Sequence, residues 1–241
     1  MKINRQGNTY TITYSAVIVL IVGIVLSMVY QALRPEQLDN IANDTKRQIL
    51  AAVHVTPQEK AEIPALYEKT ITESYIVNYH GDKVETSQEA FDINVADEVK
   101  KPDNERMLPV FVAKTDDGTK YILPCYGAGL WGPIWGYVAF DDNGDTIYGA
   151  YFSHQGETPG LGAEIEKPEF ADQFKGKNVF VDGVFESIAV VKAGQKPNEG
   201  DYVNGISGGT ITSQGVQKML RSSLQPYSSF LIKIQENRQN N

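Results

Sequence analysis

The sequence predicts an α+β fold: an antiparallel sheet with flanking helices, preceded by one N-terminal transmembrane helix. Strand-like segments flank Asp117-Gly118 and Asn143-Gly144, and such pairs are typical of tight hairpin turns. A long uncharged apolar stretch near the N-terminus predicts the membrane helix. With 41% hydrophobic and 22% charged residues, the 241-residue chain has the composition of a globular protein.

The apolar stretch covers residues 12–33, and no charged side chain occurs from residue 6 to residue 33. Roughly 20 apolar residues are enough to span the core of a bilayer. A cleaved signal peptide would end in an Ala-x-Ala-like site, which the following run SMVYQALRPEQ lacks. A buried core helix would have a polar face, and this stretch has none. We therefore expect an uncleaved membrane anchor.

The charges around the anchor predict its orientation. Lys2 and Arg5 precede it, whereas Arg34, Glu36 and Asp39 nearly cancel behind it. This bias predicts a cytoplasmic N-terminus over residues 1–11 and, in a bacterium, an inner-membrane protein with a periplasmic body. The whole chain has 30 acidic and 22 basic residues, a net charge of −8, which argues against nucleic-acid binding.

Residues 34–106 are predicted to form a helical and mixed segment outside the cytoplasm. We expect a helix from Pro35 to about Val55, with Pro35 in its first turn. Its apolar positions are Leu38, Ile41, Ile49, Leu50 and Val53. The rest of the segment has no clean periodicity. The chain has one cysteine, Cys125, so the fold depends on its core and not on an intramolecular disulfide.

The remaining domain, residues 107–241, is rich in predicted strands. LPVFVAKT and TKYILPCY form one predicted hairpin, and IWGYVAFD and DTIYGAYFSH form another. NVFVD and ESIAVVK add two candidate strands. A short helix is predicted over residues 213–225, with Val216, Met219 and Leu220 on one face, and Pro226 is expected to end it.

The run GAGLWG at residues 127–132 has the Gly-x-Gly-x-x-Gly pattern of dinucleotide sites. Such a site requires a helix to begin at the turn, but here Pro133 and a predicted strand follow. A glycine-rich bend between strands, with Trp131 and Trp135 packed nearby, is the favoured interpretation.

The run GISGG at residues 205–209 has the Gly-x-Ser-x-Gly pattern of hydrolase nucleophiles. Hydrolases with this motif place the catalytic histidine after the serine, whereas all three histidines here precede Ser207. The predicted sheet is also antiparallel. We therefore do not favour a hydrolase.

The run SGGTITSQGV begins at Ser207 and leads into the predicted helix. A loop of this kind offers free backbone N–H groups and the positive end of a helix to a phosphate. The alternative is an ordinary helix cap made by Thr212 or Ser213, which composition alone favours.

Together with the anchor, the runs GAGLWGPIWGYVAF, HQGETPGLG and SGGTITSQGV resemble the C subunit of the sodium-translocating NADH:quinone oxidoreductase over essentially the whole chain. The resemblance implies an antiparallel-sheet FMN-binding domain whose FMN is covalently linked through its phosphate to Thr210, the last residue of the family's Ser-Gly-Ala-Thr motif. Two residues depart from the family pattern: Gly209 replaces the alanine, and Asn204 replaces an aspartate. Asn204 removes a charge from the stretch that a flavin transferase recognises.

The resemblance also implies which residues surround the flavin. The amides of residues 208–210, the helix start and Lys192 are expected near the phosphate, and Leu161 against the ring. Glu157 or Thr158 is expected at the polar edge of the ring. The expected cofactor-binding residues are Thr210, Ser207, Gly208, Gly209, Thr212, Ser213, Glu157, Thr158, Leu161, Gly162, Lys192 and Trp131. No metal site is expected.

Several of these residues also have a purely structural interpretation. Leu161 can be a core leucine, Glu157 a solvated loop charge, and Trp131 a core or interface aromatic. Cys125 is most simply a buried thiol, with a cysteinyl-flavin bond as the alternative. His154 is interpreted as a hydrogen-bonded residue at a strand end.

The predicted function is a membrane-anchored flavoprotein that relays electrons within a larger NADH:quinone oxidoreductase. The expected partners are the other subunits, which by resemblance bind NADH and sodium, and a flavin transferase. One alternative is the G subunit of an Rnf-type ferredoxin:NAD electron transport complex, although GLWGPIWG and GETPGLG favour the sodium-translocating family. Another is a non-enzymatic anchored binding domain without flavin.

Overall fold

The computed structural model describes residues 7–239, so Lys2 and Arg5, on which the predicted orientation depends, lie outside the described residues. The chain divides into two compact units, Met1–Thr45 and Lys46–Asn241. The second unit contains the sheet, both clusters of core residues and the segments in which the site was predicted.

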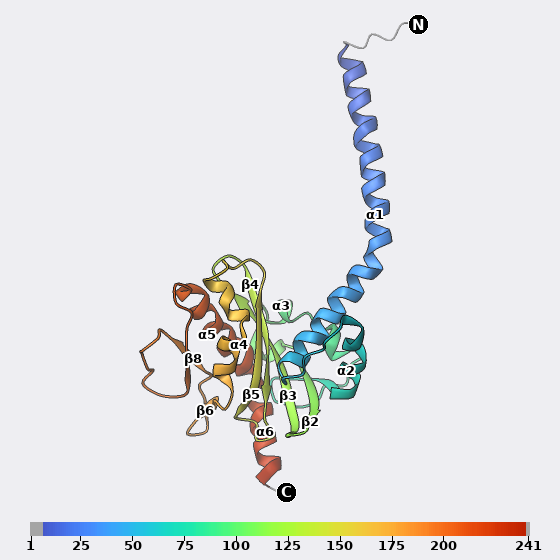
Figure 1. Cartoon of the computed structure of the whole chain (residues 1–241). Helices are drawn as coiled ribbons and strands as arrows, with labels where there is room; N and C mark the ends of the chain where they lie inside the picture. The colour runs from blue at the N-terminus through green and yellow to red at the C-terminus, as the bar shows by residue number, and fades with distance from the viewer. Residues whose placement is uncertain (1–6, 240–241) are drawn as a thin grey trace. The chain divides into compact units, whose positions relative to one another are not determined.

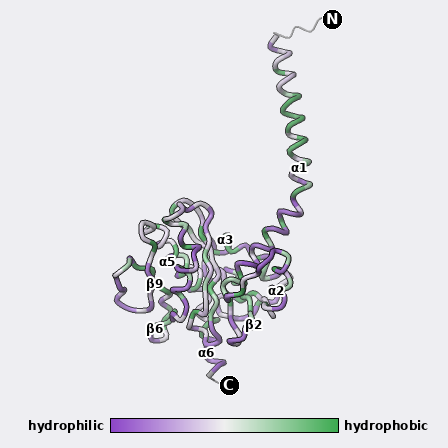
Figure 2. The backbone as a smooth tube through the Cα atoms, viewed as in Figure 1, coloured by the Kyte–Doolittle hydropathy of each residue, from purple (hydrophilic) through white to green (hydrophobic). Residues whose placement is uncertain are grey.

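The first unit consists of most of helix α1, which spans Asn8–Ala51 (Figure 1). An 18-residue stretch of α1 has a mean hydropathy of 2.6, and none of its residues is buried. This helix is therefore long and apolar enough to cross a membrane (Figure 2). The prediction of a separate helix beginning at Pro35 is wrong, because Pro35 lies inside α1. Proline removes its own backbone donor and crowds the carbonyl four residues earlier, but its fixed φ is close to the helical value, and α1 continues through it.

The end of α1 belongs to the second unit, where Gln48, Ile49 and Leu50 are buried. The indole Nε1 of Trp135 donates a hydrogen bond to Gln48 Oε1 at 3.0 Å. The prediction of one apolar face along this helix is therefore correct only for its C-terminal end. Leu38 and Ile41 are exposed, because they precede the point at which the helix meets a core.

The second unit is built on a five-stranded antiparallel sheet with strands in sequence order (Figure 1). The strands are β1 Ile71–Val77, β2 Leu108–Thr115, β3 Gly118–Ala128, β4 Pro133–Phe140 and β5 Ile147–His154. The two predicted hairpins are confirmed as β2–β3 and β4–β5, with positive φ at Gly118 and Gly144 in their turns. β1 comes from the segment without clean periodicity, where its burial follows no simple alternation.

Shorter elements surround this sheet. β6 Phe180–Val181 pairs with β7 Val184–Phe185, and β8 Ala189–Val191 pairs in parallel with β9 Tyr202–Asn204. The helices are α2 Ile63–Thr70, α3 Val95–Glu98, α4 Pro168–Ala171, α5 Thr210–Leu224 and α6 Ser228–Gln239. Pro226 does end α5, as predicted, but it also begins the 3-10 turn Gln225–Tyr227 that leads into α6, a helix the sequence analysis missed.

Apolar side chains pack on both faces of the sheet, following the two-residue period of a strand. On β2, Val110 and Val112 join the core cluster that contains α5, whereas Phe111 and Ala113 join the cluster that contains the end of α1. The predicted α5 face, Val216, Met219 and Leu220, is buried in the first of these clusters. The predicted α+β class with an antiparallel sheet is thus confirmed.

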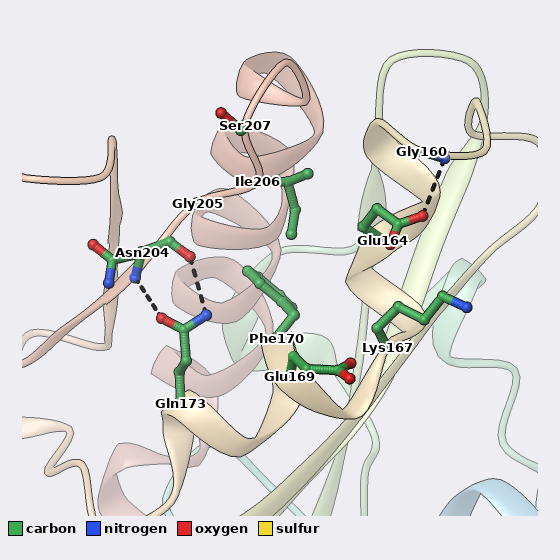
Figure 3. Close-up of a pocket in the computed structure, with 10 residues that line it drawn as sticks. All are labelled: Gly160, Glu164, Lys167, Glu169, Phe170, Gln173, Asn204, Gly205, Ile206 and Ser207. Atoms are coloured by element: carbon green, nitrogen blue, oxygen red, sulfur yellow. Dashed lines mark hydrogen bonds between the residues drawn. The ribbon is translucent and has the colours of Figure 1, made fainter.

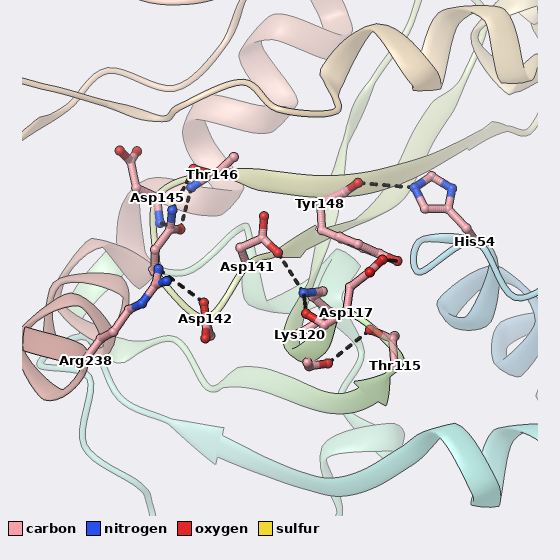
Figure 4. Close-up of polar contacts among 12 residues, drawn as sticks. His54, Thr115, Asp117, Lys120, Asp141, Asp142, Asp145, Thr146, Tyr148 and Arg238 are labelled. Carbon is pink, nitrogen blue, oxygen red and sulfur yellow. Dashed lines mark hydrogen bonds and ion pairs between the residues drawn. The ribbon is translucent and has the colours of Figure 1, made fainter. Parts of the chain in front are cut away.

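A buried lysine joins the turns of the two hairpins (Figure 4). Lys120 is 2% exposed, and its Nζ lies 2.8 Å from Asp141 Oδ1 and donates to the Asp117 carbonyl at 2.7 Å. The ring centre of Tyr148 lies 4.5 Å from the same Nζ, and the Tyr148 hydroxyl donates to Asp117 Oδ2 at 3.0 Å. This ammonium therefore replaces its water shell with an anion, a carbonyl and an aromatic face.

We predict that Lys120→Ala lowers the free energy of unfolding by about 3 kcal/mol, because it removes a buried stem and leaves Asp141 without its partner. Lys114→Ala, at an exposed position on the same hairpin, should change it by less than about 0.5 kcal/mol. Urea denaturation of the full chain in detergent measures both. Equal losses in the two variants would contradict a special role for Lys120.

Candidate functional site

Three loops meet at the start of α5. The β3–β4 turn at residues 129–132 is linked to the loop after β5 by a hydrogen bond from the amide of Trp131 to Glu157 Oε1, at 2.8 Å. That loop in turn lies against residues 205–209. A Cβ atom built on Gly209 would be only 3.3 Å from Gly162 Cα. The predicted site residues on all three loops are thus brought together, although they are far apart in sequence.

The backbone of Gly208 and Gly209 determines where α5 begins. Gly208 has φ of +75°, a conformation that favours glycine, and Gly209 is the N-cap. The Gly209 amide donates to the Ile206 carbonyl at 3.0 Å, and the Ser213 amide donates to the Gly209 carbonyl at 2.9 Å. The helix consequently begins at Thr210, three residues earlier than predicted.

Thr212 and Ser213 do not cap the helix, so that interpretation is wrong. Both are buried in the first turn of α5. The Thr212 hydroxyl donates to Glu157 Oε2 at 2.5 Å, and Ser213 Oγ accepts a hydrogen bond from the Ile206 amide at 2.8 Å. Their hydroxyls connect the helix to neighbouring loops and do not bond to its own amides.

Thr210 is exposed at the first position of α5 and lines a cavity of about 460 Å³. The same cavity is lined by Lys192, which lies just after β8, and by the predicted residues Ser207, Gly208 and Ser213. The exposed hydroxyl of Thr210 and the Lys192 cation therefore border one space. A phosphate at this position would meet a positive side chain and the positive end of a helix.

Among the residues of this cavity that the sequence analysis missed are Gln214 and Gln217 on α5. They stand four and seven positions after Thr210, so all three share one face of α5, and this spacing was available in the sequence. Gln217 Oε1 accepts a hydrogen bond from the Val190 amide at 2.8 Å, which connects α5 to β8.

The loop residues predicted to contact the flavin differ in exposure. Leu161 is 42% exposed and approaches the backbone of Gly208, and Trp131 is 69% exposed, so neither is a core residue. Thr158 is exposed, and Gly162 is buried beside Thr212. The interpretation of Glu157 as a solvated charge is wrong, since it is 4% exposed and both carboxylate oxygens accept hydrogen bonds within the protein.

Two structural interpretations are confirmed. His154 lies at the end of β5, where its Nδ1 accepts a hydrogen bond from the Glu157 amide at 3.1 Å. Cys125 is buried in β3, and burial raises the pKa of its thiol, which keeps it protonated and unreactive. The run at residues 127–132 is a bend between β3 and β4, as expected, although Trp131 in it is not packed.

A second cavity, of about 550 Å³, lies on the other side of residues 204–207 (Figure 3). The side chain of Gln173 forms two hydrogen bonds with the backbone of Asn204: it accepts from the amide at 2.9 Å and donates to the carbonyl at 3.3 Å. The Asn204 side chain points away from this cavity. The backbone of Asn204, and not its side chain, therefore anchors the stretch before Ser207 to Gln173.

Residues 129–225 match the family described as "FMN-binding domain", so the protein is a flavoprotein of the FMN-binding class. The chain is 30% identical to the C subunit of the Na(+)-translocating NADH-quinone reductase of Vibrio anguillarum, over 98% of each chain, and 31% identical to that of Vibrio vulnificus YJ016, over 90% of this chain and 91% of the relative. It belongs to the family formed by the C subunits of the Na(+)-translocating NADH-quinone reductases.

Two crystal structures support this assignment. The C subunit from Parabacteroides distasonis is 50% identical, with a TM-score of 0.77 over 83% of this chain and 96% of that chain. NqrC of Shewanella oneidensis is 26% identical, with a TM-score of 0.67 over 81% and 98%. The predicted family is therefore confirmed, and the chain is a flavoprotein subunit of an oxidoreductase complex whose other subunits are its partners.

We predict that Gly215→Ala lowers the free energy of unfolding by about 2 kcal/mol, although alanine is the better helix former. Its Cβ would lie 2.5 Å from the carbonyl oxygen of Ala128, a backbone atom that cannot move aside easily. Lys218→Ala, on the exposed side of the same helix, should have little effect. Chemical denaturation compares the two, and a stabilised Gly215→Ala protein would refute the close packing of α5 on β3.

Proposed function

We propose that the chain carries FMN covalently, through a phosphoester between the flavin phosphate and Thr210 Oγ1, and relays electrons in its complex. The observation that carries this proposal is the exposed position of Thr210 at the start of α5, where it lines a cavity together with Lys192. When bound, FMN supplies the redox-active ring. The residues of the chain hold its phosphate, orient the ring and leave it accessible to redox partners.

The fit to a phosphate rests on the start of α5. The amides of the first helical turn have no carbonyl partner within the helix, because the first such bond is that of Ser213 to Gly209. We assign the phosphate to these amides and to the Gly208 amide before them, with Lys192 as the counter-charge. Ser207 and Gly208 then contribute the rim of the site.

The ring is assigned to the exposed apolar side chains near Thr210. Leu161 and Trp131 present uncovered surface on the two neighbouring loops, and contact with a flat aromatic ring would remove part of it from water. Thr158, exposed on the same loop as Leu161, is proposed at the polar edge of the ring. The buried position of Glu157 leaves this edge to Thr158.

We also propose that α1 anchors the protein in the bacterial inner membrane, with the N-terminus in the cytoplasm and the body in the periplasm. The length and hydropathy of α1 support the anchor, and the basic residues that precede it support the orientation. A flavin transferase acting on Thr210 is the maturation partner that a phosphoester linkage requires.

The attachment predicts a mass increment. Protein from a host with its native flavin transferase should retain flavin after denaturation and exceed the apo mass by about 438 Da, the mass of FMN less one water. Thr210→Ala should lack this increment, because no hydroxyl remains at the attachment position. Intact-protein mass spectrometry with in-gel flavin fluorescence measures both quantities.

Two further variants control this experiment. Ser207→Ala removes another exposed hydroxyl of the same motif and should retain the increment. Thr210→Ser keeps a hydroxyl but loses the methyl that restricts χ1, so its modification should persist at lower yield. Flavin that stays covalently bound in Thr210→Ala, or that is lost only in Ser207→Ala, would disprove the assignment to Thr210.

The orientation predicts the behaviour of reporters fused after Asn241. A reporter that works only outside the cytoplasm should be active, and one that works only in the cytoplasm should be silent, because the body follows the membrane helix. Replacing Lys2 and Arg5 by glutamine should weaken the preference for a cytoplasmic N-terminus. Activity of the cytoplasmic reporter in the unmodified protein would contradict the proposed orientation.

A further inference from the structure

Glu157 is a buried carboxylate on the loop after β5 that contacts both the β3–β4 turn and the first turn of α5. Its Oε1 accepts from the Trp131 amide at 2.8 Å, its Oε2 accepts from the Thr212 hydroxyl at 2.5 Å, and its own amide donates to His154 Nδ1 at 3.1 Å. The side chain thereby joins the β3–β4 turn to the first turn of α5, and the backbone amide of the same residue is tied to the end of β5.

The backbone around this carboxylate is shaped to admit it. A Cβ at Gly129 would lie 2.5 Å from Glu157 Oε1, and a Cβ at Gly162 would overlap both Oε2 and the Thr212 hydroxyl. A side chain at either position would therefore displace the Glu157 carboxylate from its hydrogen bonds. The carboxylate therefore occupies a specific buried position between these two glycines and not a surface position.

Glu157 has no ion-pair partner among the lysines and arginines of residues 7–239. Burial raises the pKa of its carboxyl, but the Thr212 hydroxyl, the Trp131 and Leu130 amides and the nearby His154 together outweigh this effect and hold the pKa below its usual value. Fixed hydrogen-bond donors, more than the nearby His154, therefore keep a negative charge buried next to the first turn of α5.

Helix geometry connects this charge to Thr210. Successive helical residues are rotated by about 100°, so residues two positions apart point in nearly opposite directions. The hydrogen bond to Glu157 holds Thr212 on the inner side of α5. Thr210, two positions earlier, must then point outward, and it is indeed exposed.

We infer that Glu157 is a positioning residue of the flavin site, which turns the Thr210 hydroxyl outward through Thr212 and keeps a fixed negative charge behind it. The inference rests on the proposed attachment at Thr210. A fixed negative charge opposes the addition of electrons to a nearby flavin, so the same residue makes the flavin harder to reduce. Glu157 acts through the protein and needs no contact with the flavin.

The test uses the full chain in detergent, produced with the native flavin transferase. Glu157→Gln keeps the shape of the side chain but removes its charge, and Thr212→Val keeps the charge but removes the donor. We expect covalent flavin to form about tenfold more slowly in both variants. In a spectroelectrochemical titration, the reduction potential should become more positive in Glu157→Gln and stay near that of the unmodified protein in Thr212→Val.

Two variants serve as controls. Glu169→Gln makes the same change of charge at an exposed position outside the Thr210 cavity and should alter neither quantity. Thr212→Ser restores the hydroxyl and should restore the rate, which separates lost positioning from misfolding.

Each part of the inference has its own contrary outcome. Unchanged flavin incorporation in both Glu157→Gln and Thr212→Val would overturn the positioning role. A potential in Glu157→Gln equal to that of Glu169→Gln would overturn the role of the charge. Absence of covalent flavin from the unmodified protein would instead overturn the attachment at Thr210, so the two proposals fail in distinguishable ways.

Discussion

The close packing of α5 against the end of β3 is the constraint on which the site depends. Gly215 lies directly on the Ala128 carbonyl, and Met219 packs over Gly127, so helix and strand approach to a distance that larger residues would prevent. This contact fixes the first turn of α5 relative to the β3–β4 turn. The loops that carry Trp131 and Leu161 can then be joined to the helix by a single carboxylate, that of Glu157.

Among the buried charges of the second unit, those of Lys120 and Glu157 lie near opposite ends of β3 and are stabilised in different ways. Near the start of β3, Lys120 is compensated by Asp141, a carbonyl and the ring of Tyr148. Near its end, Glu157 is compensated by amide and hydroxyl donors beside a helix N-terminus. The first arrangement closes the turns of two hairpins, which is a structural role. The second lies beside the exposed hydroxyl to which we assign the cofactor.

The arrangement around Thr210 is consistent with a cofactor that is tethered and not enclosed. Thr210, Lys192 and three glutamines border the cavity, and the adjacent apolar side chains remain uncovered. A noncovalent ligand in such a site would depend on weak contacts alone, whereas a covalent link fixes the ligand at one point and leaves its redox-active part accessible. In the proposed electron relay, this accessibility lets electrons pass to and from the other subunits of the complex.

The sequence by itself determined the features that depend on local patterns: the apolar length of α1, the two hairpins with glycine in their turns, and the motif that ends at Thr210. Tertiary structure decided the rest. The burial of Glu157, the inward direction of Thr212 and the start of α5 at Thr210 all follow from contacts between segments distant in the chain. The same residue types can cap a helix or lie in solvent, and only the docking of α5 on β3 selects between these outcomes, because hydrogen bonding and burial depend on which groups the fold brings together.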